Sequence, residues 1–283
     1  MKKIKIVMTS SLFLLIAPNA FAMLKALNTA ASGMAAQEVH VNTISHNIAN
    51  VNTVGYKKQR AESEDLLYET VIEAGARSSD DSRYNVGLQV GSGSRIVAVR
   101  KELTQGDPQM TKNPYDLMVN GDGFFGIELP NGQIRYTRDG AFNVDSTGTL
   151  VSKNGYKVLP GITLPPATVS LTISESGVVE AFIQNQVEPI NVGQIPVFTF
   201  INPVGLRAMG ANLYGQSQSS GQPIQQVAGE SNAGVIMQGA LEASNVSIMT
   251  EMTELIRAQR AYEMNSKVMG VADQMLQTVN NIR

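Results

Sequence analysis

The C-terminal stretch, residues 245–283, has the sequence NVSIMTEMTELIRAQRAYEMNSKVMGVADQMLQTVNNIR, with no proline and one glycine. Its apolar residues recur at intervals of three and four, which predicts a helix with an a/d seam. The predicted seam comprises Ile248, Met252, Leu255, Gln259, Tyr262, Ser266, Met269, Ala272, Leu276 and Val279. A second apolar stripe runs beside it, from Met249 to Ile282. A helix that is apolar on more than one face needs more than one neighbour.

A matching pattern begins at Met23, near the other end of the chain. Its seam alternates steps of three and four through Leu24, Leu27, Ala31, Met34, Glu38, Val41, Ser45 and Ile48, with alanines on either side. This predicts a helix over residues 23–50 that ends at the sequence NVNTVG, residues 50–55, because Asn and Gly accept turn conformations. We expect the two terminal helices to pair as a coiled coil.

The first 22 residues differ from those that follow. A cationic start with Lys2 and Lys3 precedes an apolar stretch over residues 6–17, and Ala20-Phe21-Ala22 has the small residues of a cleavage site. We interpret residues 1–22 as a secretory signal peptide that is cleaved between Ala22 and Met23. The alternative is a short membrane anchor, but about 12 apolar residues are too few for a helix to cross a ~30 Å hydrocarbon core.

Between the helices the pattern changes to a period of two, interrupted by turn signals such as Asn131-Gly132. This predicts an α+β multidomain protein in which an all-β domain, residues 95–205, is inserted between two assembly helices, residues 23–55 and 245–283. We expect residues 56–94 to form a connecting segment, helical from Glu62 to Glu73 and with a polar insertion. Residues 206–244, rich in Gly, Ser, Gln and Asn, are expected to form an extended return arm.

The composition excludes several functions. The chain has 283 residues, no cysteine, two histidines and a formal net charge of −2. Thiol chemistry and disulfides are excluded, and the near-neutral charge argues against nucleic acid as a partner. His40 and His46 lie six residues apart, which is not the spacing of a two-histidine metal site on a helix. We therefore expect no catalytic residues, no cofactor and no metal.

Six sequence blocks resemble the flagellar rod and hook family. They are Ala31-Ser-Gly-Met34 with Gln37, NIANVNTVGYK at residues 47–57, MVNGDGFF at 118–125, YTRDG at 136–140, LEASNV at 241–246 and QRAYE at 259–263. Four further segments are similar to rod members rather than to hook proteins: EDLLY at 64–68, GLQVG at 87–91, NSK at 265–267 and DQML at 273–276. The polar insertion from Glu69 to Val86 is a segment that hook proteins generally lack.

The resemblance implies a structural subunit that self-assembles into a hollow helical tube, with the terminal helices in its inner layer. Such a tube transmits motor torque through the periplasm to the hook. The implied partners are copies of the same chain, proximal rod and hook proteins, surrounding ring proteins and the flagellar export apparatus. Family members generally lack a cleaved signal and begin where Met23 falls, so the export route, secretory or through the flagellar channel, stays open.

We expect the assembly interface to lie on the helices and on the asparagines at the helix end. Its predicted residues are Leu24, Leu27, Ala31, Met34, Val41, Ile48, Asn47, Asn50, Asn52, Ile248, Met252, Leu255, Arg260, Tyr262, Met269, Leu276 and Val279. The three asparagines either terminate the helix or form hydrogen bonds between subunits, and Tyr56 is expected to pack at the joint between the helix and the β-domain rather than bind a ligand. Other axial rod or hook subunits, a cell-wall hydrolase and a secreted β-domain adhesin are the alternative functions.

Overall fold

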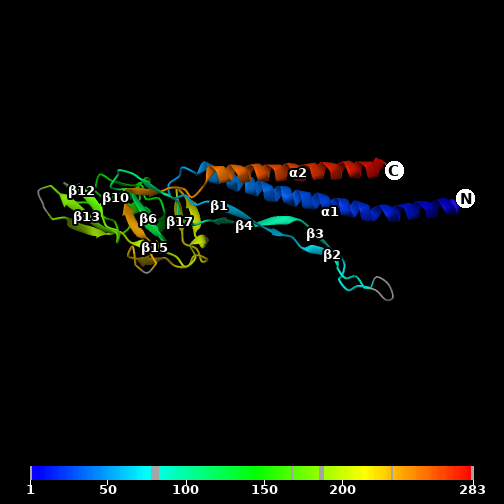
Figure 1. Ribbon diagram of the computed structural model, residues 1–283, viewed down its shortest axis with the longest axis horizontal. Helices are drawn as coiled ribbons and strands as arrows, with labels where there is room; N and C mark the ends of the chain where they lie inside the picture. Colours follow the sequence, from blue (N-terminus) through cyan, green and yellow to red (C-terminus); the bar gives the residue numbers. More distant parts are fainter. Residues whose placement is uncertain (1, 78–82, 167, 185–187, 231, 282–283) are drawn as a thin grey trace. The chain divides into compact units, whose positions relative to one another are not determined.

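The computed structural model describes residues 2–77, 83–166, 168–184, 188–230 and 232–281, without the side chains of residues 2–22, 279 and 280. Helix α1 (Lys2–Ala49) and helix α2 (Ile248–Asn281) enclose a long β-rich segment in the sequence (Figure 1). Helix α1 ends, and helix α2 begins and ends, close to the predicted positions, but α1 begins at Lys2 rather than at Met23. In the described part of the chain, no helix combines the length and apolarity needed to cross a membrane.

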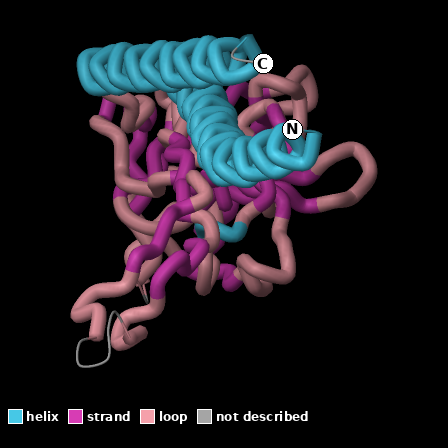
Figure 2. The backbone as a smooth tube through the Cα atoms, turned by 90° about the vertical axis from the view of Figure 1, so that its right-hand side faces the viewer, coloured by secondary structure: helices cyan, strands magenta, loops and turns pink. Residues whose placement is uncertain are grey.

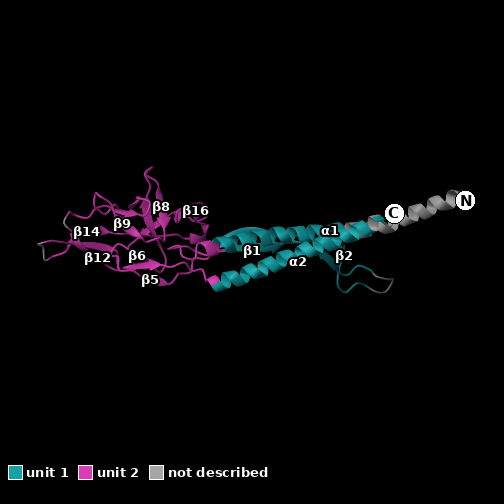
Figure 3. Ribbon diagram, turned by 90° about the horizontal axis from the view of Figure 1, so that it is seen from above, with its two compact units in different colours: residues 1–46, 60–100, 249–283 teal, residues 47–59, 101–248 magenta. Residues whose placement is uncertain are grey.

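The chain divides into two compact units, shown in Figure 3. The first, here the helix unit, contains Met1–His46, Arg60–Arg100 and Met249–Arg283. The second, here the β unit, contains Asn47–Gln59 and Lys101–Ile248. The end of α1 and the segment after it therefore belong to the β unit, although the sequence pattern assigned them to an assembly helix.

Two short antiparallel ribbons accompany the helices in the helix unit. Strand β1 (Gln59–Asp65) pairs with β4 (Ser94–Lys101), and β2 (Tyr68–Ile72) pairs with β3 (Leu88–Gly91). The expected helix from Glu62 to Glu73 is therefore wrong. Glu62 and Glu64 instead form ion pairs with Arg100 and Arg95 of the partner strand, both at 2.5 Å, and such cross-strand charge pairs favour the sheet.

The polar insertion continues the second ribbon. Beyond β2 and β3, the amide of Gly75 donates to the Tyr84 carbonyl and the amide of Tyr84 donates to the Ala76 carbonyl. An isolated bridge joins Arg77 to Arg83, and residues 78–82 lie outside the described residues. Where described, the segment is thus a β-hairpin rather than the loop that its polar composition suggested.

The β unit is built from many short strands, which with their loops make up most of the chain between the helices (Figure 2). Its largest sheet has the order β16-β17-β8-β7-β11-β10-β9; in addition, β15 pairs with β7, and β18 pairs with β15. The strands are β5 (Pro108–Met110), β6 (Leu117–Asn120), β7 (Phe124–Glu128), β8 (Ile134–Thr137), β9 (Phe142–Val144), β10 (Leu150–Ser152), β11 (Lys157–Val158), β12 (Thr168–Ile173), β13 (Val178–Ile183), β14 (Ile190–Gln194), β15 (Val197–Thr199), β16 (Arg207–Gly210), β17 (Leu213–Gly215), β18 (Ile224–Gln226), β19 (Val235–Gln238) and β20 (Ala240–Glu242), with a 3-10 turn at Pro203–Gly205.

The core of the β unit consists of a large aliphatic cluster and a smaller aromatic one. Phe125 packs edge-on against Phe142 in the first, with ring centroids 5.2 Å apart. The second gathers Phe124, Tyr136, Phe198, Phe200, Leu206 and Tyr214. The β7–β8 hairpin turns at Asn131-Gly132, as predicted. Its loop has three residues rather than two, since the amide of Leu129 donates to the Gln133 carbonyl.

Residues 206–244 are not an extended arm. They supply strands β16 to β20, and β19 pairs with β6 while β20 pairs with β5. Ile236 and Ala240 are fully buried in the β unit. The composition of this region did not reveal β19 and β20, because their partner strands lie more than a hundred residues earlier in the sequence and tertiary pairing can outweigh local propensity.

Candidate assembly site

Helix α2 packs within the chain along two series of residues that each repeat every seven positions. The first series is Glu251, Ala258, Asn265 and Ala272, all buried or half-buried. The second is Leu255, Tyr262, Met269 and Leu276, of which Tyr262 remains 45% exposed. The predicted seam contained the second series, but it placed Met252, Gln259 and Ser266 where the structure has Glu251, Ala258 and Asn265. In the first series, Ala258 and Ala272 are small enough to allow a neighbouring backbone to approach closely; this series is called the inner series below.

Most apolar residues of α2 outside these two series are exposed, and Tyr262 of the second series is partly exposed as well. Met249 is 76% exposed and Met264 is 61% exposed. Among the described residues of α2, the exposed large apolar side chains are Ile248, Met249, Met252, Ile256, Tyr262, Met264, Val268, Val271 and Met275. Val279 lies in α2, but its side chain is outside the described set. Exposed apolar surface of this extent on one helix is typical of an interaction face.

Helix α1 is buried along a line beside the predicted seam. Ala30, Ala36, Thr43 and Ile44 are buried, and Leu27, Met34, Val41 and Ile48 are half-buried. The alternate members of the predicted seam, Leu24, Ala31, Glu38 and Ser45, are exposed. The helix is rotated from the predicted orientation because it also packs on the ribbons.

Two polar contacts join α1 to the ribbons. The Lys25 ammonium donates to the Glu69 carboxylate at 2.7 Å and to the Val90 carbonyl at 3.1 Å. About two turns further along, the Ser32 hydroxyl accepts a hydrogen bond from the Ser94 amide. Gly93, beside it, has a φ of +113° and no room for a Cβ, which would lie against the Ser32 hydroxyl.

A buried ionic cluster in the β unit joins three of the sequence blocks. The Lys57 ammonium contacts the Glu242 carboxylate at 2.5 Å, and the Arg138 guanidinium contacts the same carboxylate at 3.4 Å. Lys57 and Glu242 are each 1% exposed and Arg138 is 5% exposed. Lys57 also donates to the Thr104 carbonyl, and the Gly106 amide donates to Glu242. One carboxylate thus holds together the end of the α1 region, the β8 strand and the approach to α2.

The electrostatics of the cluster reflect its burial. Burial lowers the pKa of the Lys57 ammonium below its ordinary value of 10.5, and the adjacent Glu242 carboxylate opposes this effect. Tyr214, buried in the aromatic cluster, has its pKa raised by burial to about 12. Buried charges are tolerated when they are paired and hydrogen-bonded, as Lys57 and Glu242 are here.

The backbone around the cluster is tightly constrained at Gly55. Its φ is +67°, and a Cβ at this position would lie 2.6 Å from the Arg138 carbonyl carbon. Its amide donates to the Glu242 carbonyl at 2.8 Å. Only glycine satisfies both the left-handed backbone and the close approach.

The asparagines of the helix end are used mainly within the chain. The Asn47 side chain accepts hydrogen bonds from the Tyr56 hydroxyl and the Gln59 amide and donates to the Gln59 carbonyl. Asn50 accepts a hydrogen bond from the Thr53 hydroxyl. Asn52 is exposed, and so is Arg260 on α2. Of the two roles considered for these asparagines, helix termination is the one that the single chain displays for Asn47 and Asn50.

Asn245, just before α2, likewise forms side-chain hydrogen bonds to neighbouring segments. Its side-chain oxygen accepts a hydrogen bond from the Lys58 amide, and its amide nitrogen donates to the carbonyls of Glu102 and Thr104. Lys58 in turn accepts a backbone hydrogen bond from Glu102. Hydrogen bonds therefore join the segment after α1, the segment before α2 and residues 102–104, which follow β4.

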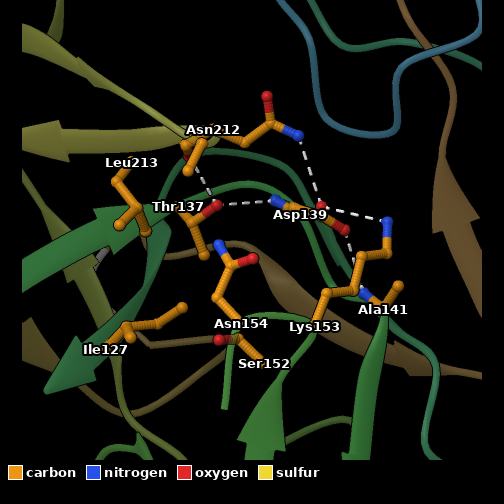
Figure 4. A pocket seen from close by; sticks show the side chains of 10 residues that line it. Ile127, Thr137, Asp139, Ala141, Ser152, Lys153, Asn154, Asn212 and Leu213 are labelled. Carbon is orange, nitrogen blue, oxygen red and sulfur yellow. Dashed lines mark hydrogen bonds and ion pairs between the residues drawn. The ribbon is translucent and has the colours of Figure 1, made fainter. Parts of the chain in front are cut away.

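A hollow of about 200 Å³ in the β unit is lined by polar side chains (Figure 4). Asp139 lies at its centre and accepts hydrogen bonds from Asn212, Lys153 and the Ala141 amide. The Thr137 hydroxyl bridges the Asp139 amide and the Asn212 carbonyl. Because these polar groups satisfy one another, the arrangement stabilises the turn after β8 and does not have the character of a ligand site.

Sequence reasoning missed Lys57, Arg138, Glu242 and Asn245 as site residues. Each lies in a sequence block that was recognised, so the blocks contained a signal. Charged residues are usually solvent-exposed, however, and nothing in the local pattern shows that three of them meet in the interior.

Three protein-family models match parts of the chain. A flagella basal body rod protein model matches residues 27–57, a flagellar hook protein FlgE/F/G D1 domain model matches residues 118–181, and a flagellar basal body rod FlgEFG protein C-terminal model matches residues 237–282. All three regions contain residues of the buried cluster or of the helices described above. A relative from Caulobacter vibrioides is 48% identical over 92% of this chain and 100% of its own length.

The chain thus belongs to the flagellar rod and hook family, which consists of structural proteins and not enzymes. The Caulobacter relative is a flagellar basal-body rod protein FlgG, as are a Borreliella burgdorferi relative (48% identical, 92% of this chain and 99% of the relative) and a Bacillus subtilis relative (36%, 92% and 100%). The chain is accordingly a structural protein of the flagellar basal-body rod. A solved structure, the Helicobacter pylori flagellar hook protein FlgE2, has 17% identity and a TM-score of 0.23, with 66% of this chain and 43% of that chain covered.

Proposed function

We propose that the chain is a subunit of the distal rod and that its two terminal helices pair as a coiled coil and pack against those of other copies. In this proposal the copies form a hollow helical tube that transmits motor torque to the hook. The exposed apolar face of α2 is the observation that supports this assembly, because the single chain leaves nine large apolar side chains of α2 uncovered among its described residues.

The free energy available from covering this face is large. Completely burying a side chain of this kind contributes about 1.5–3 kcal/mol, and these side chains are roughly half covered already. Nine of them would then contribute on the order of 10 kcal/mol per subunit before the entropic cost of ordering is subtracted. That is enough to drive polymerisation of concentrated subunits.

The remaining parts of the proposal concern location and partners. We place the tube across the periplasm, with proximal rod proteins at one end, hook proteins at the other and ring proteins around it. The export apparatus delivers the subunits. These assignments follow from family membership and from the motifs, and the Glu69–Val86 hairpin supports the distal rod over the hook.

Electron microscopy of the concentrated protein tests the proposal. We expect negatively stained tubes or helical polymers, with the β unit intact by circular dichroism in both monomer and polymer. A protein that remains monomeric at all concentrations, salts and pH values tried, and that does not add to isolated basal bodies, would contradict assembly through the terminal helices.

A further inference from the structure

A glycine of α1 faces an asparagine of α2 in the helix unit. A Cβ added to Gly33 would lie 2.7 Å from the side-chain nitrogen of Asn265 and 3.3 Å from its Cγ. A side chain at position 33 would therefore require the Asn265 amide to move away from its present position. Glycine disfavours a helix interior, so its presence here serves the contact rather than the helix.

Asn265 is the one amide in the inner series of α2, where Ala258 and Ala272 are its neighbours one heptad away. A polar residue at such a position is a known way to specify the register of a helix pair at some cost in stability, and Glu251, two heptads before Asn265, is the other polar member of the series. On α1, the residues one heptad from Gly33 are Ala26 and His40. Each has a Cβ, so a displacement of one heptad in either direction would bring that atom against the Asn265 amide.

We propose that Gly33 and Asn265 form a register lock that selects one antiparallel alignment of α1 and α2. This inference rests on the proposed pairing of the terminal helices and deepens it. Alanine-rich helices can slide past one another, because small side chains fit many offsets. The lock excludes the competing offsets, so every copy enters the assembly with the same helix alignment.

Cysteine cross-linking can read the register directly, since the natural chain contains no cysteine. Ala30 precedes Gly33 by three residues and Val268 follows Asn265 by three, and both line a hollow of about 660 Å³ between the helices and β2–β3. The double variant Ala30→Cys/Val268→Cys therefore reports the native register. The variant Gln37→Cys/Val268→Cys reports a register displaced by one heptad. Neither pair changes Gly33 or Asn265.

We expect the native pair to cross-link roughly tenfold or more faster than the displaced pair. The displaced register leaves the half-buried Asn265 amide badly placed, which makes that register less populated by about this factor. Asn265→Leu should reduce the ratio of the native to the displaced cross-linking rate at least severalfold, while the helices remain paired. Gly33→Ala should slow cross-linking of the native pair, and Asn265→Ala in the same chain should restore it. Gly270→Ala is the matched control, because a Cβ there meets nothing within 4 Å, and it should leave the ratio unchanged.

Two results would overturn the lock: an unchanged ratio in Asn265→Leu, or a Gly33→Ala variant that behaves like Gly270→Ala. Electron microscopy of the same samples separates this inference from the proposed function. Preferential cross-linking of the native pair in subunits that never form tubes would support the lock and refute the assembly role. Tubes in which the native pair fails to cross-link would refute both the pairing of these helices and the lock.

Discussion

The substitution Glu242→Gln should destabilise the β unit strongly. The change keeps the shape of the side chain but removes the charge that Lys57 and Arg138 share, at a carboxylate that is 1% exposed. Removing one partner of a buried ion pair costs about 3–5 kcal/mol, because the other charge stays buried without compensation. This is a large part of the ~5–15 kcal/mol that stabilises a typical domain.

The assay is thermal unfolding of the full chain, followed by circular dichroism or calorimetry. For a domain of this size, 1 kcal/mol corresponds to about 2–4 °C, so the transition of the β unit should fall by roughly 6–20 °C. Glu230→Gln is the matched control, because Glu230 is exposed and its carboxylate can be neutralised at the surface. Its transition should move by less than about 2 °C, as is usual for surface changes.

A double substitution sharpens the test. Lys57→Met together with Glu242→Gln removes both members of the closest pair, so its cost should be clearly smaller than the sum of the two single costs. If Glu242→Gln shifted the transition no more than Glu230→Gln does, the cluster would not be buried in solution, and the reasoning would fail.

Three further predictions concern the helices, the aromatic cluster and the mature chain. Leu255→Asp or Met269→Asp should abolish tubes in negative stain, since an unpaired carboxylate in an apolar contact costs several kcal/mol. The β unit should be spared, and Val169→Asp, an exposed apolar position on β12, should still assemble. Tyr214 has a folded pKa of about 12 against an ordinary 10.0, so its contribution of roughly 2–3 kcal/mol is complete below pH 10 and is lost as the pH rises toward 12. Tyr214→Phe should flatten the alkaline limb of a pH–stability curve, and an unchanged limb would argue against burial of the hydroxyl. Intact-mass measurement of protein from the native cell should give a chain that begins at Met23, and a species that retains residues 1–22 would exclude cleavage.

Local signals predicted the helices and several turns well. The end of α1 lies at Ala49 because residues 50–55 favour turn conformations, and Gly55 in the turn that follows has a left-handed backbone. The hairpin at Asn131-Gly132 forms for the same kind of reason. These features depend on a few neighbouring residues, so one sequence is enough to find them.

Features that depend on distant partners could not be predicted in the same way. The inner series of α2 passes through Asn265 rather than Ser266, because the facing residue is a glycine and the amide fits against it. Strand β19 pairs with β6, more than a hundred residues earlier in the sequence, and no local pattern identifies that partner. Lys57 and Glu242, which are 185 positions apart, become a pair only when the β unit closes around them.

The buried carboxylate of Glu242 also has a mechanical consequence. Lys57 follows the end of one terminal helix, and Glu242 precedes the start of the other by a few residues. Along the backbone, each helix is joined directly to the β unit through one of these two segments, and the Glu242 side chain links the two segments. Force on one terminal helix is thus resisted in part by the segment that holds the other helix. We expect the two segments to detach from the β unit together rather than one at a time.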